Sequence, residues 1–125
     1  MKLLLDTHTL LWWLDGGRKL SAHARTLIAD PENEVYVSAV TAWEIVVKKA
    51  IGKLVAPDNL EEEVIRHQFD RLSISFAHVS ELQKLPTIHR DPFDRMLIAQ
   101  ARAEVLTIVT KDPNFPKYDV ETVEA

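Results

Sequence analysis

The sequence predicts an α/β fold of three layers, in which helices cover both faces of a mostly parallel sheet of four to five strands. Short continuous apolar runs such as Leu3–Leu5, typical of strands buried on both faces, recur along the chain. Segments with apolar residues at helical spacing lie between these runs, and this alternation indicates a parallel sheet. Because the 125 residues contain no repeat or linker, residues 1–125 are expected to form a single domain.

Five segments are expected to form the strands. Leu3–Leu5, Val35–Val37 and Leu106–Val109 are continuous apolar runs. The alternating pattern Leu72-x-Ile74 indicates a further strand, and Val120–Val123 is a weaker candidate for a strand at the sheet edge. These segments are spread over the whole chain, so the expected sheet joins its two ends.

Helices are expected between the strands. Their apolar stripes are, in chain order, Thr7, Leu10, Leu11 and Leu14; Ala24, Leu27 and Ile28; Trp43, Val46, Val47 and Ala50; and Ile65, Phe69 and Leu72. Ser21 is expected to cap the second helix, and Gly52 lies near the end of the third. The last helix has Asp91 at its cap and Pro92 at its first position, and the apolar run Met96–Ala99 predicts that it is buried.

The composition excludes several classes of protein. Lys and Arg number 15 against 19 Asp and Glu, so the net charge of −4 disfavours nucleic-acid binding through basic charge alone. The absence of cysteine excludes disulfides, thiol nucleophiles and Cys-ligated metals, and three glycines are too few and wrongly spaced for a phosphate-binding loop. No membrane span or signal peptide is predicted, so an intracellular protein is expected.

Four carboxylates are placed where predicted strands end or the following helices begin. Asp6 directly follows the first strand, and Asp112 follows the strand Leu106–Val109. Glu44 and Asp94 are expected in the first turns of two helices. Because ligand crevices in parallel sheets lie beyond the carboxyl ends of the strands, these four side chains are expected at one edge of the sheet.

Each acid by itself has an ordinary structural explanation, as a helix cap, a turn residue or, for Glu44, a partner of Lys48 or Thr41. Their clustering is costly, because two like charges about 4 Å apart repel by about 4 kcal/mol at an effective dielectric near 20. Such a cluster raises carboxylate pKa values or binds a divalent cation. Oxygen ligands suit Mg²⁺ or Mn²⁺, which would polarise a phosphate and activate water. The predicted chemistry is metal-assisted phosphodiester cleavage.

Four short motifs carry a family resemblance. They are Leu3-Leu4-Leu5-Asp6-Thr7, Ser38-x-x-Thr41-x-x-Glu44, Asp91-x-x-Asp94-Arg95-x-x-Ile98-Ala99 and Thr110-Lys111-Asp112-x-x-Phe115. In their order and spacing, over residues 2–123, the chain resembles the PIN-domain ribonucleases, and most of all the VapC-type toxins of bacterial and archaeal toxin–antitoxin pairs. It departs from the family pattern in two places, since His8 stands where Asn is common and Asp91 is an additional acid.

The resemblance implies a set of site residues. The catalytic and metal-binding acids would be Asp6, Glu44, Asp94 and Asp112. Thr7 or Ser38 would orient the ligands or water. Apart from the resemblance, Asp91, Arg95 and Lys111 are candidates for supporting the ligands or contacting the substrate, because they lie close to the predicted acids. Asp91 is expected to serve mainly as the helix cap.

The resemblance also implies a cofactor, partners and a location. The cofactor would be Mg²⁺ or Mn²⁺ and the substrate RNA, with no membrane involved. A cognate antitoxin would neutralise the acids with an Arg or Lys side chain. The protein would be a homodimer in the cytoplasm of a bacterium or archaeon.

Two alternative functions remain. A receiver-like domain would accept a phosphoryl group on an aspartate, but the strand Val35–Val37 is followed by Ser38 where that aspartate is needed. A PIN-like module that only binds protein would have lost site acids, and all four are present. Metal-dependent RNA cleavage is therefore preferred.

The aromatic and histidine side chains predict less. Trp13 and Trp43 lie on apolar stripes and are expected in the core. Trp12 lies off its stripe, which favours an interface with a second copy or an antitoxin over RNA base stacking. His8 and His89 are expected near the acids as surface or supporting residues.

Overall fold

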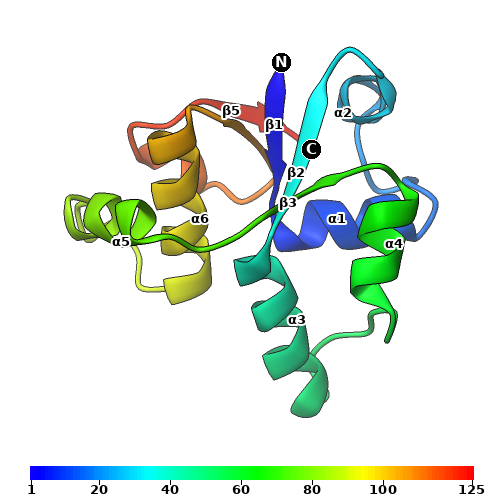
Figure 1. Cartoon of the computed structure of the whole chain (residues 1–125), viewed down its shortest axis with the longest axis horizontal. Helices are drawn as coiled ribbons and strands as arrows, with labels where there is room; N and C mark the ends of the chain where they lie inside the picture. The colour runs from blue at the N-terminus through cyan, green and yellow to red at the C-terminus, as the bar shows by residue number, and fades with distance from the viewer.

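Strands and helices alternate along the chain in the computed structural model, which describes all residues 1–125 (Figure 1). The strands are β1 (Lys2–Leu5), β2 (Glu34–Ser38), β3 (Asp70–Leu72), β4 (Thr107–Thr110) and β5 (Thr122–Glu124). The helices are α1 (Thr7–Leu14), α2 (Ala22–Ala29), α3 (Ala39–Ala50), α4 (Leu60–Arg66), α5 (Phe76–Gln83) and α6 (Pro92–Glu104), with a 3-10 turn over Phe115–Lys117. All neighbouring strands are parallel, in the order β3-β2-β1-β4-β5, so the predicted α/β class is confirmed.

Strand β1 lies at the centre of the sheet because its three leucines supply both faces. Leu3 and Leu5 belong to one apolar core cluster and Leu4 to the other, since side chains alternate between the faces of a strand. All three are fully buried, and such burial contributes roughly 1.5–3 kcal/mol for each side chain. The run is apolar throughout because neither face of this strand meets water.

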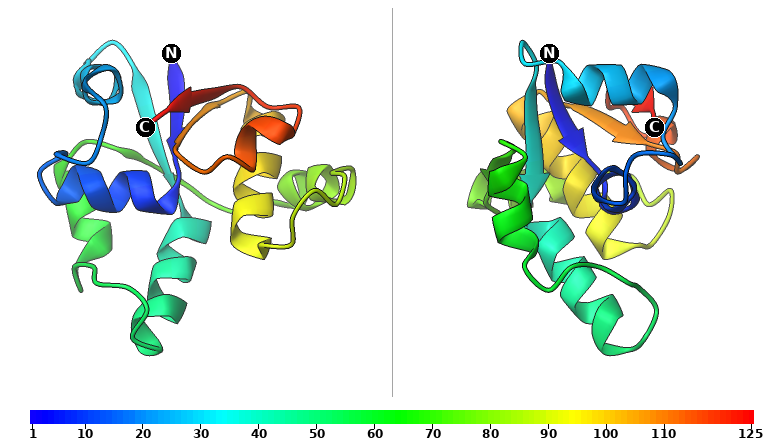
Figure 2. Two further views of the ribbon diagram at one scale, coloured as in Figure 1. Left: turned by 180° about the vertical axis from the view of Figure 1, so that it is seen from behind. Right: turned by 90° about the vertical axis from the view of Figure 1, so that its right-hand side faces the viewer.

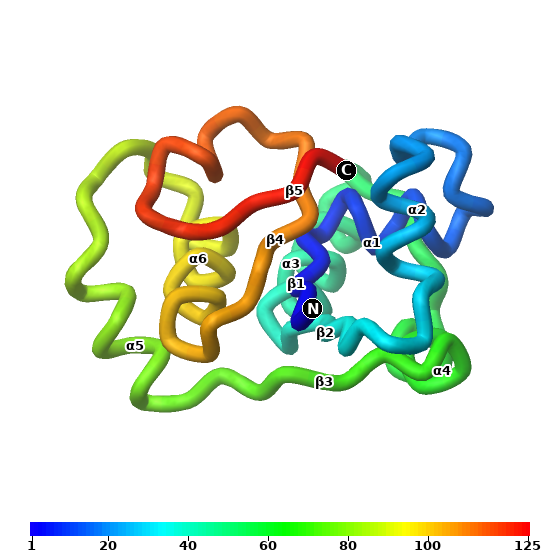
Figure 3. The backbone as a smooth tube through the Cα atoms, turned by 90° about the horizontal axis from the view of Figure 1, so that it is seen from above, coloured from blue at the N-terminus to red at the C-terminus, as the bar shows by residue number.

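Helices cover each face of the sheet, as the three-layer prediction requires (Figures 2 and 3). Leu10 of α1, Ile28 of α2 and Val64 of α4 pack into the cluster that contains Leu3. Leu97 of α6 packs into the opposite cluster, and α5 packs against α6. Helix α3 projects beyond the carboxyl ends of the strands (Figure 1).

Two of the predicted helix caps are confirmed. Ser21 accepts a hydrogen bond from the Ala24 N–H at 3.0 Å, and Asp91 accepts one from the Phe93 N–H at 2.9 Å. Helix α5 was not predicted from the sequence. Its capping box pairs Ser75 with His78, a residue that lacks the carboxyl or amide oxygen of the usual capping signature.

The predicted buried face of α3 is wrong. Trp43 is 54% exposed, and Val46 and Val47 are also exposed, whereas Thr41 and Glu44 are buried. Because α3 projects from the sheet, only the side that carries Thr41 and Glu44 is covered. Helical periodicity identifies an apolar stripe, but it cannot identify which stripe another element covers.

The predicted apolar stripe of α4 also extends too far. The helix ends at Arg66, and the chain turns at Gln68 with a φ of 61° before β3 begins. Phe69 is buried in the core from this turn and Leu72 belongs to β3. Ile65 is exposed and Leu72 packs against the cluster on the opposite face of the sheet, so helical spacing in the sequence does not place these residues in one buried stripe.

The strand order creates a crevice between β1 and β4. Chain connections leave the sheet in opposite directions on the two sides of this pair, and ligands of open α/β sheets bind at such switch points. Receiver domains have the order 2-1-3-4-5, so the observed order 3-2-1-4-5 excludes the receiver-like alternative. No helix combines the length and apolar character that crossing a bilayer requires.

Candidate functional site

An acidic pocket of about 350 Å³ lies at the carboxyl ends of β1 and β4. Five carboxylates line it: Asp6, Glu44, Asp91, Asp94 and Asp112. The other lining residues are Thr7, His8, Trp12, Lys48 and Lys111. The structure therefore brings together the four acids that the sequence singled out, although they come from different elements of the chain.

Asp6 is held by the segments on both sides of the crevice. Its Oδ1 accepts a hydrogen bond from the Thr9 N–H at 2.9 Å, which caps α1. Its Oδ2 accepts one from the Thr110 hydroxyl of β4 at 2.6 Å. Burial raises the pKa of Asp6, and the hydrogen bonds from Thr110 and Thr9 partly oppose this increase. The carboxylate is thereby fixed in orientation at the point where β1 ends.

Glu44 is buried, and each of its two carboxylate oxygens has a partner. It lies in the second turn of α3, one turn later than predicted, because this helix begins at Ala39. The Thr7 hydroxyl donates to its Oε1 at 2.5 Å, and Lys48, one turn further along the helix, forms an ion pair with its Oε2. Hydrogen bonding to Glu44 raises the pKa of Lys48, so the pocket contains a positively charged ammonium group beside its acids.

Asp94 is the most strongly perturbed group of the site. It occupies the first turn of α6, and its side chain is 17% exposed. Burial, followed by repulsion from Asp91, Asp112, Glu44 and Asp6, raises its pKa to about 8. The contributions of these neighbours show that Asp94 lies within electrostatic reach of all the other acids.

Three polar side chains outside the acidic pocket are linked by hydrogen bonds to one another and to Asp94. His89 Nε2 lies 3.3 Å from Asp94 Oδ2, and His89 Nδ1 lies 2.7 Å from the Tyr118 hydroxyl. Arg95 donates to the same hydroxyl at 3.1 Å and to the Pro86 carbonyl at 2.8 Å. The sequence placed His89 near the acids but gave no signal for Tyr118, which approaches from a distant loop.

The remaining two acids carry backbone hydrogen bonds. Asp91 Oδ1 accepts from the N–H groups of Phe93 and Asp94, at 2.9 and 3.0 Å, so its predicted role as the cap of α6 is confirmed. Asp112 Oδ1 accepts from the Asn114 N–H at 2.8 Å, which closes the predicted turn. In both residues the second carboxylate oxygen has no hydrogen-bond partner within the chain and is available to the pocket.

The other predicted site residues have different positions. Thr7 and Lys111 line the pocket. Ser38 does not, since its hydroxyl caps α3 and donates to the buried Gln100 side chain at 2.6 Å. Arg95 also lies outside the pocket and reaches Asp94 only through Tyr118 and His89. These two residues can influence the acids through the elements they hold, but neither of them lines the pocket.

The donor chemistry of the pocket fits Mg²⁺ or Mn²⁺. The acids offer hard carboxylate oxygens, the ligands that these ions prefer, and the raised pKa of Asp94 shows negative charge that a divalent ion would offset. No three His, Asp or Glu side chains come close enough together to coordinate a common ion. Fewer direct ligands suffice for Mg²⁺, because this ion keeps several water molecules and is usually bound by one or two carboxylates.

A family model described as the PIN domain matches residues 3–121, a range that contains all four acids and ends just before β5. The chain belongs to the PIN domain family. No curated protein matches the sequence. Among solved structures, this PIN domain is similar to VapBC2 from Rickettsia felis bound to promoter DNA, with a TM-score of 0.74, 15% identity and coverage of 100% of this chain and 99% of that one.

Two further structures are similar to this PIN domain. DNA-bound VapBC from Salmonella typhimurium has a TM-score of 0.71 at 17% identity, with 99% of this chain and 98% of that chain covered. FitAcB from Neisseria gonorrhoeae has a TM-score of 0.64 at 21% identity, with coverage of 98% and 96%. At these identities the likeness establishes the fold, and the function has to be argued from the site.

Proposed function

We propose that this PIN domain is a Mg²⁺- or Mn²⁺-dependent endoribonuclease and the VapC-type toxin of a toxin–antitoxin pair, with residues 1–125 working as one catalytic domain. The observation that carries the proposal is the convergence of acids from separate elements on one pocket at the switch point of the sheet. Without an ion this arrangement is costly, as the raised pKa of Asp94 indicates. A purely structural role would not require such a cost.

In this proposal Asp6, Glu44, Asp94 and Asp112 hold the metal. A divalent ion held by these residues would polarise the phosphate and activate water for the attack. The hydroxyl groups of Thr7 and Thr110 orient the Glu44 and Asp6 carboxylates through the hydrogen bonds described above. The chain supplies ligands whose orientation is set before the substrate arrives.

Two lysines supply the positive charge of the pocket. Lys48 and Lys111 line it on different elements, so a phosphodiester that enters meets cationic groups as well as acids. Lys48 is also the residue that would release Glu44 when an ion binds. We therefore assign phosphate positioning to these two lysines and not to Arg95, which bonds to Tyr118 and Pro86.

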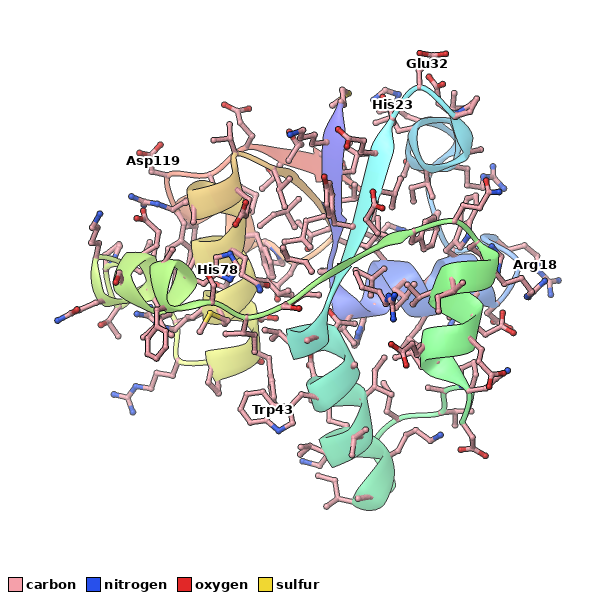
Figure 4. All side chains as sticks on the ribbon, viewed as in Figure 1. Arg18, His23, Glu32, Trp43, His78 and Asp119 are labelled. Atoms are coloured by element: carbon pink, nitrogen blue, oxygen red, sulfur yellow. The ribbon has the colours of Figure 1, made fainter.

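The test is cleavage of a structured RNA by the purified protein, with Mg²⁺, with Mn²⁺ and with EDTA. Asp94→Asn removes one ionised ligand while keeping the shape of the side chain, and we expect at least a hundredfold lower rate because loss of a metal ligand costs several kcal/mol of charge stabilisation. Asp119→Asn is the matched control, since this exposed acid lies outside the pocket (Figure 4). Equal rates for the wild type and Asp94→Asn would reject the assigned site.

A cognate antitoxin is the proposed partner. The similar structures from Rickettsia felis and Salmonella typhimurium are VapBC complexes bound to DNA. A pocket lined by five carboxylates would accept an Arg or Lys side chain of an inhibitor. These complexes support an antitoxin, and the proposed location is the cytoplasm of a bacterium or archaeon, where such a toxin meets RNA.

The proposed homodimer has a surface to form on. Trp43 is exposed on α3 (Figure 4), as are Val46 and, in the turn after this helix, Ile51. The Trp43 ring contacts Phe93 of α6, with ring centroids 4.7 Å apart. Exposed apolar surface of this kind is typical of an interface. Light scattering should give twice the chain mass at micromolar concentration, and Val46→Glu should yield the monomer. A monomeric wild type would contradict the proposal.

A further inference from the structure

A second cavity lies directly beside the acidic pocket. It has a volume of about 610 Å³ and separates α1 from the segment 54–57 that follows α3. His8 and Trp12 line both the cavity and the acidic pocket, so these two rings form the boundary between them. The remaining lining is mainly apolar, with Leu11, Leu14 and Val55 among its residues.

Trp12 differs from its neighbour in sequence by its surroundings. Trp13 packs against Phe69, and its indole N–H donates to His67 Nδ1 at 3.3 Å. Trp12 is half-buried, its indole N–H has no hydrogen-bond partner within the chain, and its ring faces His8 edge-on at 5.8 Å between centroids. Its position leaves aromatic surface accessible from the two cavities.

A lysine holds Trp12 in place on the side of the acidic pocket. The Lys111 Nζ lies 5.2 Å from the centroid of the Trp12 ring, within the range of a cation–π interaction. The same ammonium group donates to the Lys19 carbonyl at 2.6 Å, which ties it to the loop after α1. The ring is thus oriented by a cation that also faces the proposed position of the phosphate.

We propose that the second cavity is a nucleobase subsite, in which a base next to the cleaved phosphodiester stacks on Trp12. The inference rests on the proposed nuclease function. Aromatic rings beside cationic groups are the features by which proteins hold single-stranded nucleic acid, because every base has a face to stack and every nucleotide a phosphate. The shared boundary places the two features one nucleotide apart, with the phosphate at the acids and the base across the Trp12 ring.

The charges around the cavity favour a nucleic acid over the proposed antitoxin as its occupant. The charged side chains that line it are Asp15 and Lys19, and Lys111 stands at its border with the acidic pocket. An inhibitor side chain of Arg or Lys would be attracted by the five acids of the pocket, whereas the second cavity has no excess of acids. A neutral base attached to an anionic backbone matches an apolar cavity bordered by lysine.

The experiment compares binding of a short single-stranded RNA with binding of an abasic oligonucleotide, the same RNA in which only the nucleotide next to the cleaved phosphodiester lacks its base. It uses the full chain carrying Asp94→Asn and Mg²⁺, so that the RNA stays intact. We expect the RNA to bind about 5- to 100-fold more tightly, the range that stacking of one base supports. Trp12→Leu should reduce this ratio to less than twofold, while Trp12→Phe should keep most of it.

Phe76→Leu is the matched control, because Phe76 is an aromatic residue of α5 that is 92% exposed and outside both cavities. A Trp12→Leu protein that keeps the full ratio would overturn the inference, as would one that loses antitoxin binding while keeping the ratio. Fluorescence gives a second measurement with Trp12 intact. In a chain carrying Trp13→Phe and Trp43→Phe, RNA should quench the emission of Trp12 more than the abasic oligonucleotide does, and equal quenching would overturn the inference.

Failure of the nuclease proposal can be distinguished from failure of the subsite. If the wild type does not cleave RNA but the ratio depends on Trp12, the subsite stands and the catalytic assignment falls. If the wild type cleaves RNA and the ratio does not depend on Trp12, the catalytic assignment stands and the subsite falls.

Discussion

Because the pKa of Asp94 is raised, the free energy of unfolding of the metal-free protein should depend on pH. The carboxyl ionises near the ordinary value of 3.8 in the unfolded chain but near 8 in the folded protein. Between these values the folded state binds more protons than the unfolded state, so stability falls as the pH rises. Above pH 8 the Asp94 carboxyl is ionised in both states, and the loss of folding stability reaches its full value.

The magnitude of this cost follows from the two pKa values. Each pH unit between them contributes about 1.4 kcal/mol, which gives a ceiling of about 5–6 kcal/mol above pH 8. Water reaches part of this side chain and screens the repulsion, so we expect about 2–4 kcal/mol. Asp94→Asn removes the charge and should stabilise the metal-free protein by this amount at pH 8.5, and by much less at pH 5.

Urea unfolding in EDTA at pH 5, 7 and 8.5 measures the difference in the free energy of unfolding between the two proteins. Asp119→Asn serves as the control and should show no pH-dependent difference, since Asp119 is exposed and outside the pocket. A gap between Asp94→Asn and wild type that stays constant with pH, or a wild type that is more stable at pH 8.5, would refute the reasoning.

Three further predictions concern the metal and two helices. Millimolar Mg²⁺ should raise the Tm of the wild type more than that of Asp94→Asn, because an ion at 100 times its Kd stabilises the folded state by about 2.7 kcal/mol. Equal shifts of Tm in thermal scans would show that Asp94 is not a metal ligand. Ser38→Ala removes both the cap of α3 and the hydrogen bond to Gln100, so urea unfolding should show a loss of about 1–3 kcal/mol; an unchanged midpoint would contradict this. Val105 ends α6 with a φ of 56°, unfavourable for a β-branched residue, so Val105→Gly should raise the free energy of unfolding by about 1 kcal/mol; a decrease would show that the turn is not strained.

Much of the fold could be predicted from local features of the sequence. The leucines of β1 are buried on both faces, and Asp91 and Pro92 begin α6, because alternation and capping depend only on residues close in the chain. Helix α5 escaped prediction because its capping box uses His78 (Figure 4), whose buried ring also contacts Glu104 of the neighbouring helix α6. Trp43 was wrongly predicted to lie in the core because the exposure of a helix face also depends on elements distant in sequence.

The sequence by itself determined which residues could form an acidic site. Asp6 and Asp112 follow strands whose parallel arrangement is implied by the alternation of strands and helices, and that places their carboxylates at one edge. The tertiary structure decided how these acids are held and charged. Tyr118 reaches His89 from a separate loop, and burial among acids from other elements raises the pKa of Asp94. Hydrogen bonding and desolvation act through space, over a few ångströms, whatever the separation in the chain.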